Sequence, residues 1–167
     1  MELELIKNSK TKKIGKDIIY FEKLESTQDY AKQIVENENV DGTIVITNNQ
    51  TKGKGTKDRR WIAKENENIT MTIILKPNWE VSKLDGLTLN IAEEIQKGIK
   101  ELYSYNLKLK EPNDLLLNNK KICGILTQSS IISNKVKYVL IGIGVNVNQV
   151  EYDEELRKNS YVAKERI

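Results

Sequence analysis

The chain of 167 residues contains no histidine and a single cysteine. Without histidine there is no Ser-His-Asp or Cys-His catalysis, no histidine-ligated zinc and no imidazole acid–base chemistry. Any chemistry must therefore depend on positioning, on carboxylates, lysine or arginine, and on a recruited metal ion. This profile suits acid activation or phosphoryl-type reactions, in which anions are held in line and developing charge is neutralised.

The one cysteine, Cys123, excludes an intramolecular disulfide and a cysteine-built metal site, which fits a reducing compartment. It lies in an apolar run between Ile122 and Gly124, so we expect a buried structural thiol and not a nucleophile. The sequence also lacks a run of about eighteen apolar residues, and residues 1–20 contain no apolar stretch of signal-peptide length. We therefore expect a cytoplasmic protein that does not enter a membrane.

Charge of one sign is not concentrated anywhere in the chain. The 27 basic and 24 acidic residues are interleaved, and they give a formal net charge of only +3. No basic tail or stripe is available to follow a nucleic-acid backbone, so we expect no nucleic-acid partner. An apolar content of 38% with 31% charged residues is ordinary for a soluble globular protein, and the length predicts a single domain over residues 1–167.

A basic, glycine-rich stretch runs from Thr47 to Trp61 between two apolar segments. Gly53 and Gly55 can take positive φ and allow backbone N–H groups to approach a ligand. The cations that could meet an anion are Lys52, Lys54, Lys57, Arg59 and Arg60. A loop of this length without secondary structure of its own is uncommon unless it is functional or disordered. We expect it to bind phosphate or carboxylate; a solvated basic surface loop is the alternative.

The other segments alternate between strand and helix patterns. Strands are predicted at residues 18–21, 43–47, 69–75, 107–110, 114–117, 121–128 and 138–147, with 43–47 paired to 69–75 and a hairpin joining 114–117 to 121–128. Helices are predicted from an N-cap at Ser26 to about residue 36, from about 82 to 102, and over 153–157. The spacing alone favours a capping role for Ser26 and Thr27. Gly142 and Gly144, inside the last strand, indicate close approach by a ligand or another backbone. These elements predict an α+β domain.

Four stretches, in the same order, resemble the catalytic domain of biotin–protein ligases (biotin–acetyl-CoA-carboxylase ligases). They are Glu25-Ser-Thr-Gln28; Gln50 with Gly53-Lys-Gly…Arg59-Arg-Trp61; Lys110-Glu-Pro-Asn-Asp114 with Lys120-Lys-Ile-Cys-Gly-Ile-Leu126; and Gly142-Ile-Gly-Val-Asn-Val-Asn148. The resemblance runs from about Tyr20 to Asn148. It implies a mixed β-sheet backed by helices, similar to class II aminoacyl-tRNA synthetases and lipoate ligases.

The resemblance also implies a set of site residues. Those implied to bind biotin are Ser26, Thr27, Gln50, Gly53, Lys54, Lys121, Gly124, Gly142 and Gly144. Those implied to bind ATP or the adenylate are Lys54, Thr56, Lys57, Arg59, Trp61, Lys110, Asn113, Asp114 and Asn146. The implied catalytic residues are Lys121, Lys54 and Lys110, and Asp114 is the implied ligand of Mg²⁺.

The implied reaction has two steps. Biotin first reacts with MgATP to give biotinyl-5′-AMP and pyrophosphate, and a lysine of an acceptor protein then takes the biotinyl group and releases AMP. The implied acceptor is a biotin carboxyl carrier domain of a biotin-dependent carboxylase, and the expected assembly is a monomer or a homodimer. A non-catalytic or weakly catalytic module that binds biotin or its adenylate is an alternative, as is a relative of lipoate ligases.

The sequence departs from the family pattern at several places. Thr56 replaces an arginine that normally holds the adenylate, and Lys54 keeps a charge without the planar two-pronged geometry of arginine. Glu111 stands where the family usually has tryptophan, which adds a negative charge near a site for anions. We also expect neither the N-terminal DNA-binding domain nor the small C-terminal barrel domain of the family, and hence no repressor activity.

Overall fold

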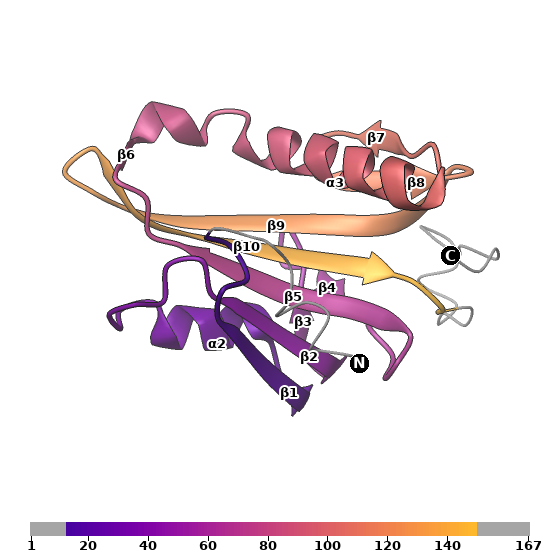
Figure 1. Ribbon diagram of the computed structural model, residues 1–167, viewed down its shortest axis with the longest axis horizontal. Coiled ribbons are helices and arrows are strands. Elements are labelled where there is room, and N and C mark those ends of the chain that lie inside the picture. The colour runs from indigo at the N-terminus through magenta and orange to yellow at the C-terminus, as the bar shows by residue number, and fades with distance from the viewer. Residues whose placement is uncertain (1–12, 150–167) are drawn as a thin grey trace.

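The structure, a computed structural model, describes residues 13–149 and is built on one mixed sheet with a helix on each face (Figure 1). The helix predicted at residues 153–157 lies outside the described residues. The strands follow one another across the sheet in the order β1 (Ile18–Leu24), β2 (Ile44–Gln50), β5 (Asn68–Leu75), β10 (Lys135–Asn146), β9 (Lys120–Ile132), β8 (Asp114–Leu117) and β7 (Lys108–Lys110), and β6 (Trp79–Glu80) pairs with the start of β10.

The direction of each strand follows from its connection. β1 and β2 are parallel because α2 (Thr27–Ile34) carries the chain back between them. The remaining neighbours in the sheet are antiparallel, including the predicted pairing of β2 with β5. The prediction of an α+β domain with a mixed sheet backed by helices is therefore confirmed.

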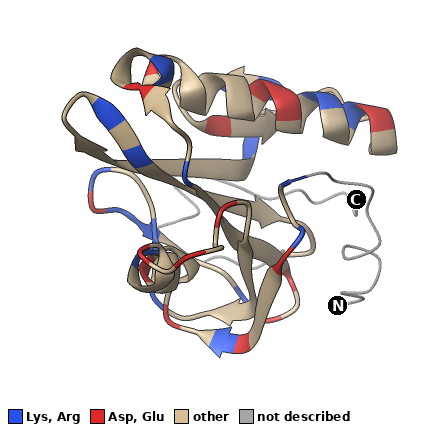
Figure 2. Cartoon of the chain, turned by 60° about the vertical axis from the view of Figure 1, so that its left-hand side comes forward, with Lys and Arg blue, Asp and Glu red and all other residues tan. Residues whose placement is uncertain are grey.

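Alternation along the strands sends successive side chains to opposite faces of the sheet. On one face, Val45, Ile74 and Leu140 are buried against α2. On the other face, Ile141 and Ile143 belong to the core that packs under α3 (Leu87–Tyr103). Charges of both signs lie along the exposed side of α3 (Figure 2). The helix α2 begins only at Thr27, so the part of the sheet beyond its N-terminus is not covered by this helix.

The long helix begins later than its apolar periodicity predicts. Gly86 is the N-cap of α3 with φ 71°, a left-handed conformation, and the chain before it forms a separate 3-10 turn, η1 (Val81–Leu84). The prediction of a continuous helix from about residue 82 is wrong at this end, because a residue in that conformation cannot continue an α-helix. At the other end, Ser104 is also left-handed, with φ 59°, and ends the helix as a C-cap.

Two hairpins have two-residue turns, and the one that joins β8 to β9 was predicted. Asn118 and Asn119, with φ of 50° and 62°, connect β8 to β9, and Ser133 and Asn134, with φ of 47° and 61°, connect β9 to β10. Two consecutive positive φ angles suit the right-handed twist of a two-residue hairpin, and asparagine tolerates them better than most residues. Between β9 and β10 the register shifts once, between Val136 and Tyr138, and beyond that shift Gly124 lies opposite Gly144.

The basic stretch between β2 and β5 has more structure than the sequence suggests. Gly53 pairs with Trp61 and Lys54 with Arg60, so that two short strands, β3 (Gly53–Lys54) and β4 (Arg60–Trp61), form a ladder of their own. The expectation of a long loop without secondary structure is therefore wrong. The ladder folds the stretch back over the sheet and places Trp61 against it.

Candidate ligand-binding site

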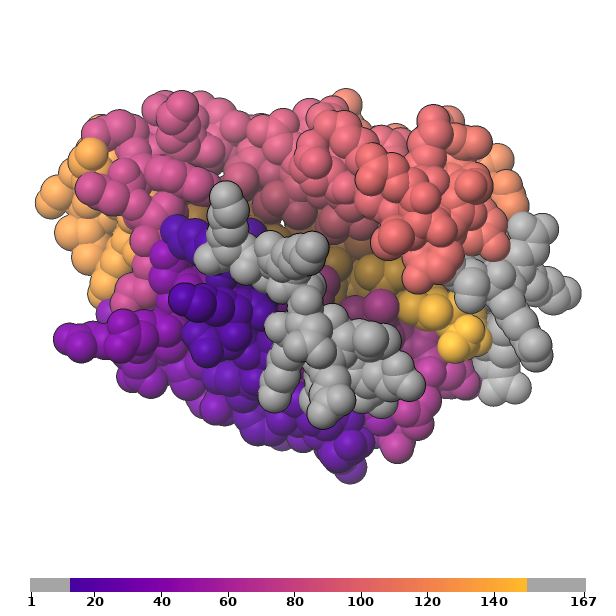
Figure 3. All heavy atoms as spheres, viewed as in Figure 1, coloured from indigo at the N-terminus to yellow at the C-terminus, as the bar shows by residue number. Residues whose placement is uncertain are grey.

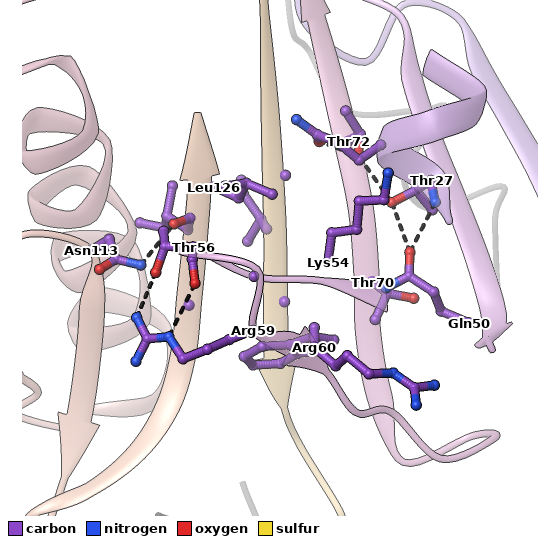
Figure 4. Close-up of a pocket in the computed structure, with 18 of the residues that line it drawn as sticks. Thr27, Gln50, Lys54, Thr56, Arg59, Arg60, Thr70, Thr72, Asn113 and Leu126 are labelled. Atoms are coloured by element: carbon purple, nitrogen blue, oxygen red, sulfur yellow. Dashed lines mark hydrogen bonds between the residues drawn. The ribbon is translucent and has the colours of Figure 1, made fainter. Parts of the chain in front are cut away.

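A cavity of about 790 Å³ opens on the α2 face of the sheet, beyond the N-terminus of that helix. In the space-filling view, atoms of β10 are visible between the mass formed by α3 and the mass formed by the N-terminal elements (Figure 3). The close-up shows residues of α2, β2 and β5 on one side of the cavity and residues near β8 and β9 on the other (Figure 4). This volume lies in the range of small-molecule sites, which is about 300–1,000 Å³.

Three glycines, Gly124, Gly142 and Gly144, form the floor of the cavity. Side chains of Trp61 and Gln28 pack directly on them. A Cβ on Gly144 would overlap the Trp61 ring, and one on Gly124 would lie 2.9 Å from the same ring. A Cβ on Gly142 would lie 2.8 Å from Gln28 Oε1. The close approach predicted from Gly142 and Gly144 is thus made by a tryptophan and a glutamine, and a larger residue at these positions would expel them.

One side of the cavity is a neutral hydrogen-bonding network centred on Gln50 (Figure 4). Gln50 Oε1 accepts from the backbone N–H of Thr27 at 2.9 Å and from Thr27 Oγ1 at 3.1 Å. Thr72 Oγ1 in turn donates to Thr27 Oγ1 at 2.9 Å. Because its oxygen is already occupied, Gln50 can offer a ligand only the N–H donors of Nε2, which have no partner among residues 13–149.

Ser26 serves the helix and remains available to a ligand. Its Oγ accepts from the backbone N–H of Asp29 at 3.3 Å, which confirms the predicted N-cap. A hydroxyl that accepts in this way keeps its own hydrogen free to donate. Ser26 and Gln50 therefore both present donors, and this side of the cavity is suited to a carbonyl oxygen.

Gln28 and Thr72 belong to this network although the sequence analysis did not select them. Gln28 Oε1 lies 3.1 Å from Thr72 Oγ1 and shares the one hydroxyl hydrogen of Thr72 with Thr27 Oγ1, and Gln28 Nε2 donates to Gln128 Oε1, also at 3.1 Å. Gln28 stands in the Glu25-Ser-Thr-Gln28 stretch, but the resemblance implies no role for it. For Thr72 the available signal was the alternation of Thr70 and Thr72 with apolar neighbours, which places both hydroxyls on one face of β5.

The other side of the cavity contains a largely buried ion pair. Lys121 Nζ lies 2.6 Å from Asp114 Oδ1, with the two side chains 19% and 13% exposed. The contact lacks hydrogen-bond geometry, and Asp114 Oδ1 has no hydrogen-bond partner within residues 13–149. Lys121 Nζ also lies 5.5 Å from the centre of the Trp61 ring. Breaking a buried pair by removing one partner is costly, so each charge fixes the other.

Lys54 is also paired, but at the surface. Its Nζ lies 2.6 Å from Asp29 Oδ1, and the two side chains are 51% and 44% exposed. Exposed pairs contribute only about 0–1 kcal/mol, so this contact can yield to a bound anion. It lies at the α2 side of the cavity, beside Thr27 (Figure 4).

Three further cations line the cavity without a carboxylate partner among the described residues: Arg59, Arg60 and Lys110. Arg59 Nε donates to the carbonyl oxygen of Thr56 at 3.1 Å, and Arg59 Nη2 donates to Thr56 Oγ1 at 2.5 Å. Thr56, which lacks the charge of the arginine expected there, is therefore held by a neighbouring arginine (Figure 4). Arg60 was not among the predicted site residues.

The cavity brings together most of the predicted site residues. Thirteen line it: Ser26, Thr27, Gln50, Lys54, Thr56, Arg59, Trp61, Lys110, Asn113, Lys121, Gly124, Gly142 and Gly144. Four do not: Gly53, Lys57, Asp114 and Asn146. Gly55 and Arg60, named only as part of the basic stretch, also line it, and the lining residues with no predicted role are Gln28, Ile62, Thr70, Met71, Thr72, Ile125, Leu126 and Ile143. Ile125, Leu126 and Ile143 lie within the stretches that carry the resemblance, but no role was implied for them.

Each of the four residues outside the lining has another place. Gly53 pairs with Trp61 in the β3–β4 ladder, and Lys57, with φ 54°, lies at the exposed turn of that ladder. Asp114 faces Lys121. Asn146 Nδ2 donates to the backbone carbonyl of Lys121 at 3.2 Å, so Asn146 holds the backbone of this lysine and does not face the cavity.

Asn113 lines the cavity with its amide already committed to β9. Its Nδ2 donates to the carbonyl oxygen of Ile125 at 3.0 Å, and the backbone N–H of Ile125 donates back to the Asn113 carbonyl at 2.9 Å. The preceding Glu111–Pro112 peptide bond is cis. Asn113 therefore forms a fixed wall, with its Oδ1 and the second hydrogen of its Nδ2 left for a ligand.

The described residues hold no ready-made metal cage. Residues 13–149 contain no group of three or more His, Cys, Asp or Glu side chains placed to bind a metal ion. Asp114, the predicted Mg²⁺ ligand, is one carboxylate that already faces Lys121. Such a donor set does not fit a resident metal, although Mg²⁺ commonly binds through one or two carboxylates together with substrate phosphates.

Cys123 is fully buried, as predicted for a structural thiol. Burial raises its pKa to about 12, so the thiolate that a nucleophile requires does not form near neutral pH. Among the described helices none is long and apolar enough to cross a membrane.

Comparison with known proteins identifies the class of this fold and cavity. The sequence model of the Biotin/lipoate A/B protein ligase family matches residues 20–146, and the chain belongs to that family. Among curated proteins, the chain is 37% identical over 158 residues to the bifunctional ligase/repressor BirA of Bacillus subtilis, an alignment that covers 93% of this chain and 49% of that protein. It is 33% identical over 109 residues to the biotin–acetyl-CoA-carboxylase ligase of Paracoccus denitrificans, covering 62% and 43% of the two chains.

Solved structures show the same architecture. The biotin protein ligase from Aquifex aeolicus, in complex with biotin and ATP, superposes with a TM-score of 0.68 at 28% identity, over 88% of this chain and 59% of that one. The present chain therefore spans about half the length of the curated relatives and a little more of this structural neighbour.

Proposed function

We propose that this chain activates biotin with ATP to biotinyl-5′-AMP and transfers the biotinyl group to a lysine of a biotin carboxyl carrier domain. The proposal rests on a chemical difference between the two sides of the cavity. On the α2 side, the donors of Ser26 and Gln50 are neutral and the charge of Lys54 is balanced by Asp29, whereas Lys121, Lys110 and Arg59 line the side toward β7, β8 and β9. Biotin has the same division, with a ureido carbonyl at one end and a carboxylate at the other.

Recognition of the ureido ring rests on the network around Gln50. The carbonyl oxygen of the ring accepts from the Ser26 hydroxyl and from Gln50 Nε2, the two donors that the network leaves free. Trp61 and Leu126, which lie on the same face of the sheet as the glycines, contribute apolar surface to the same cavity. Apolar walls with a few fixed polar groups are typical of small-molecule sites, and they favour a neutral bicyclic ring over a charged one.

In the first step, a carboxylate oxygen of biotin attacks the α-phosphorus of ATP. A bond forms between the acyl oxygen and phosphorus, and the bond to the β-phosphate breaks to release pyrophosphate. Both reactants are anions, so the cations of Lys121, Lys110 and Arg59 offset their repulsion and stabilise the charge that develops. Mg²⁺ enters as part of the substrate MgATP, in keeping with the absence of a metal cage in the described residues.

In the second step, the neutral amine of the acceptor lysine attacks the acyl carbon of the adenylate, and AMP leaves with the bonding electrons. Trp61 and Lys121 lie together at the cationic side, 5.5 Å from nitrogen to ring centre, and line the cavity where the mixed anhydride forms. The acceptor amine must therefore reach that side of the cavity.

The decisive experiment is the exchange of labelled pyrophosphate into ATP by the purified chain. Exchange that requires biotin supports the proposal, because only reversible adenylate formation returns label to ATP. Exchange that requires lipoate instead of biotin would assign the chain to the lipoate branch of the family. Calorimetric binding of biotin without exchange would make the chain a binding module.

A further inference from the structure

Two buried asparagines join the segment behind Trp61 to the backbone of Lys121. The backbone N–H of Lys64 donates to Asn68 Oδ1 at 2.7 Å. Asn68 Nδ2 donates to Asn146 Oδ1 at 2.8 Å, and Asn146 Nδ2 donates to the carbonyl oxygen of Lys121 at 3.2 Å. The second hydrogen of Asn68 Nδ2 goes to Gln149 Oε1, also at 2.8 Å. Asn68 and Asn146 are only 6% and 5% exposed.

The direction of this hydrogen-bonded chain cannot be reversed. One end is a backbone N–H, which can only donate, and the other is a backbone carbonyl, which can only accept. Each link between them must accept on one side and donate on the other, as a side-chain amide does. Aspartate at position 68 has the same shape but no donor, and it would face the oxygens of Asn146 and Gln149.

The two ends of the chain of hydrogen bonds lie beside the cavity. Lys64 follows Trp61 by three residues, and the ring of Trp61 lies on Gly124 and Gly144. Lys121 carries the ammonium that lies 5.5 Å above that ring. The asparagines do not line the cavity, yet they fix the spacing between two of its walls.

We propose that Asn68 is a positioning residue for the reaction: through Asn146 it holds the backbone of Lys121 in register with Trp61. The inference rests on the proposed function, because Lys121 is assigned there to the reacting anions. Asn68 touches no ligand itself. Its removal should therefore affect the turnover step and leave the neutral biotin-binding side unchanged.

The kinetic test compares the parent, Asn68→Asp, Asn146→Asp and the double variant in biotin-dependent pyrophosphate exchange. Misplacement of a catalytic group by about 1 Å can cost about a hundredfold, so each single variant should lose roughly tenfold to a hundredfold in kcat. The KM for biotin should stay within about twofold, because Ser26 and Gln50 are untouched. The double variant should be no worse than either single one, since both break the same chain.

Val35→Ala is the control for general destabilisation, because Val35 is buried in the α2 core away from the cavity. It should lower thermal stability and leave kcat unchanged at temperatures below its transition. A normal kcat in both aspartate variants overturns the proposal, as does an equal loss of kcat in Val35→Ala. If Asn68→Asp does not fold, Asn146→Asp decides the kinetic outcome alone.

A spectroscopic arm separates failure of the inference from failure of the proposed function. The chain has two tryptophans, so Trp79→Phe leaves Trp61 as the only one. In that background, without ligand, Asn68→Asp and Asn146→Asp should each shift Trp61 emission to longer wavelength, whereas Val35→Ala should not. Should the parent show no exchange, the proposed function fails and the emission result decides on the asparagines. Unchanged emission in both variants overturns their role.

Discussion

At the scale of the residue, Lys121 differs from an ordinary surface lysine because its charge is mostly buried and faces a buried carboxylate. We predict that Lys121→Ala abolishes adenylate formation while the fold persists. Truncating one group that stabilises a transition-state charge should cost about 2.7–4 kcal/mol, or roughly 10²–10³ in rate. Pyrophosphate exchange measures the loss, and Lys120→Ala, at the exposed neighbouring position on β9, is the matched control. Exchange at the parental rate in Lys121→Ala would remove this lysine from the mechanism.

Thr56 is the second residue with a specific expectation. An arginine there could form a charge-assisted hydrogen bond to the adenylate worth about 1.5–3 kcal/mol. Such a bond would slow release of the adenylate by roughly tenfold to a hundredfold. We predict that the parent releases biotinyl-adenylate readily and that Thr56→Arg slows the release, although Arg59 must first leave its contacts with Thr56. Release can be followed by filter binding. Thr51→Arg adds the same charge outside the cavity and should change nothing; equal release from Thr56→Arg and the parent would contradict the prediction.

The residues proposed to contact the ligand could be predicted from the sequence, and most of those that orient them could not. Lys121, Gln50 and Ser26 belong to motifs, and the structure places all three in the cavity. Thr72 and Gln28 were missed because a hydroxyl or amide buried between strands has no local signature; its role depends on partners more than forty residues away. Asp114, the partner of Lys121, was predicted to bind ATP and Mg²⁺, and its pairing with Lys121 could not be foreseen because it depends on the register of β8 with β9.

At the scale of the element, ion pairs hold the β3–β4 ladder on its first strand only. Lys52 and Lys54 are paired with Glu25 and Asp29, both at 2.6 Å, whereas residues 57–60 carry no carboxylate partner within the described chain. We predict that trypsin cuts the free protein after Lys57, Arg59 or Arg60 in preference to Lys52 or Lys54, and that biotin with ATP slows these cuts. Peptide mapping identifies the sites.

The control for this digestion is cleavage within α3, which ligands should leave unchanged. Equal digestion of the ladder with and without saturating biotin plus ATP would contradict ordering by the ligand. Fast cleavage after Lys52 would instead show that the exposed ion pairs do not hold the first half of the ladder.

The turn of the same ladder contains a residue in a strained conformation. Asp58 has φ 58°, a region that costs an ordinary residue roughly 1–2 kcal/mol, whereas glycine adopts it freely at an entropic cost of roughly 0.5–1 kcal/mol. Asp58→Gly should therefore raise the free energy of unfolding by up to about 1 kcal/mol. Denaturant unfolding measures the change. Asp85, with φ −64°, is the matched site at which glycine should be neutral or destabilising, and a destabilised Asp58→Gly would show that its side chain is needed.

At the scale of the whole molecule, Asp41 ties the segment before β1 to the end of β5. Burial alone would raise the pKa of Asp41, but the hydrogen bonds from Lys13 and from the backbone N–H of Lys76 outweigh it and hold the pKa below its usual range. A carboxylate with a lowered pKa contributes stability above its ordinary pKa, and the contribution is lost as the pH falls through the folded value.

The expected result is that Asp41→Asn lowers the melting temperature at neutral pH and that the difference from the parent shrinks on acidification below the ordinary range of aspartate. Thermal melts of both proteins from neutral to acidic pH measure it. If the difference in melting temperature did not change with pH, the charge of Asp41 would not be the source of its contribution to stability.

Much of the fold was predictable because periodicity is a local property. The strand and helix patterns gave the elements and the α+β class, while the start of α3 at Gly86 and the ladder inside the basic stretch were missed. The order of strands could not be derived in the same way, because pairing between distant segments, such as β5 with β10, leaves no trace in the spacing of either.

The position of β10 also determines when the sheet can be completed during synthesis. This strand is the last described one in the sequence, yet it lies in the middle of the sheet between β5 and β9. During synthesis β5 and β9 emerge with open edges that can pair with other chains until residues 135–146 are available to join them. Because Gly142 and Gly144 also form the cavity floor, a nascent chain cannot capture its ligand early, and assembly of the sheet and the ability to bind arrive together.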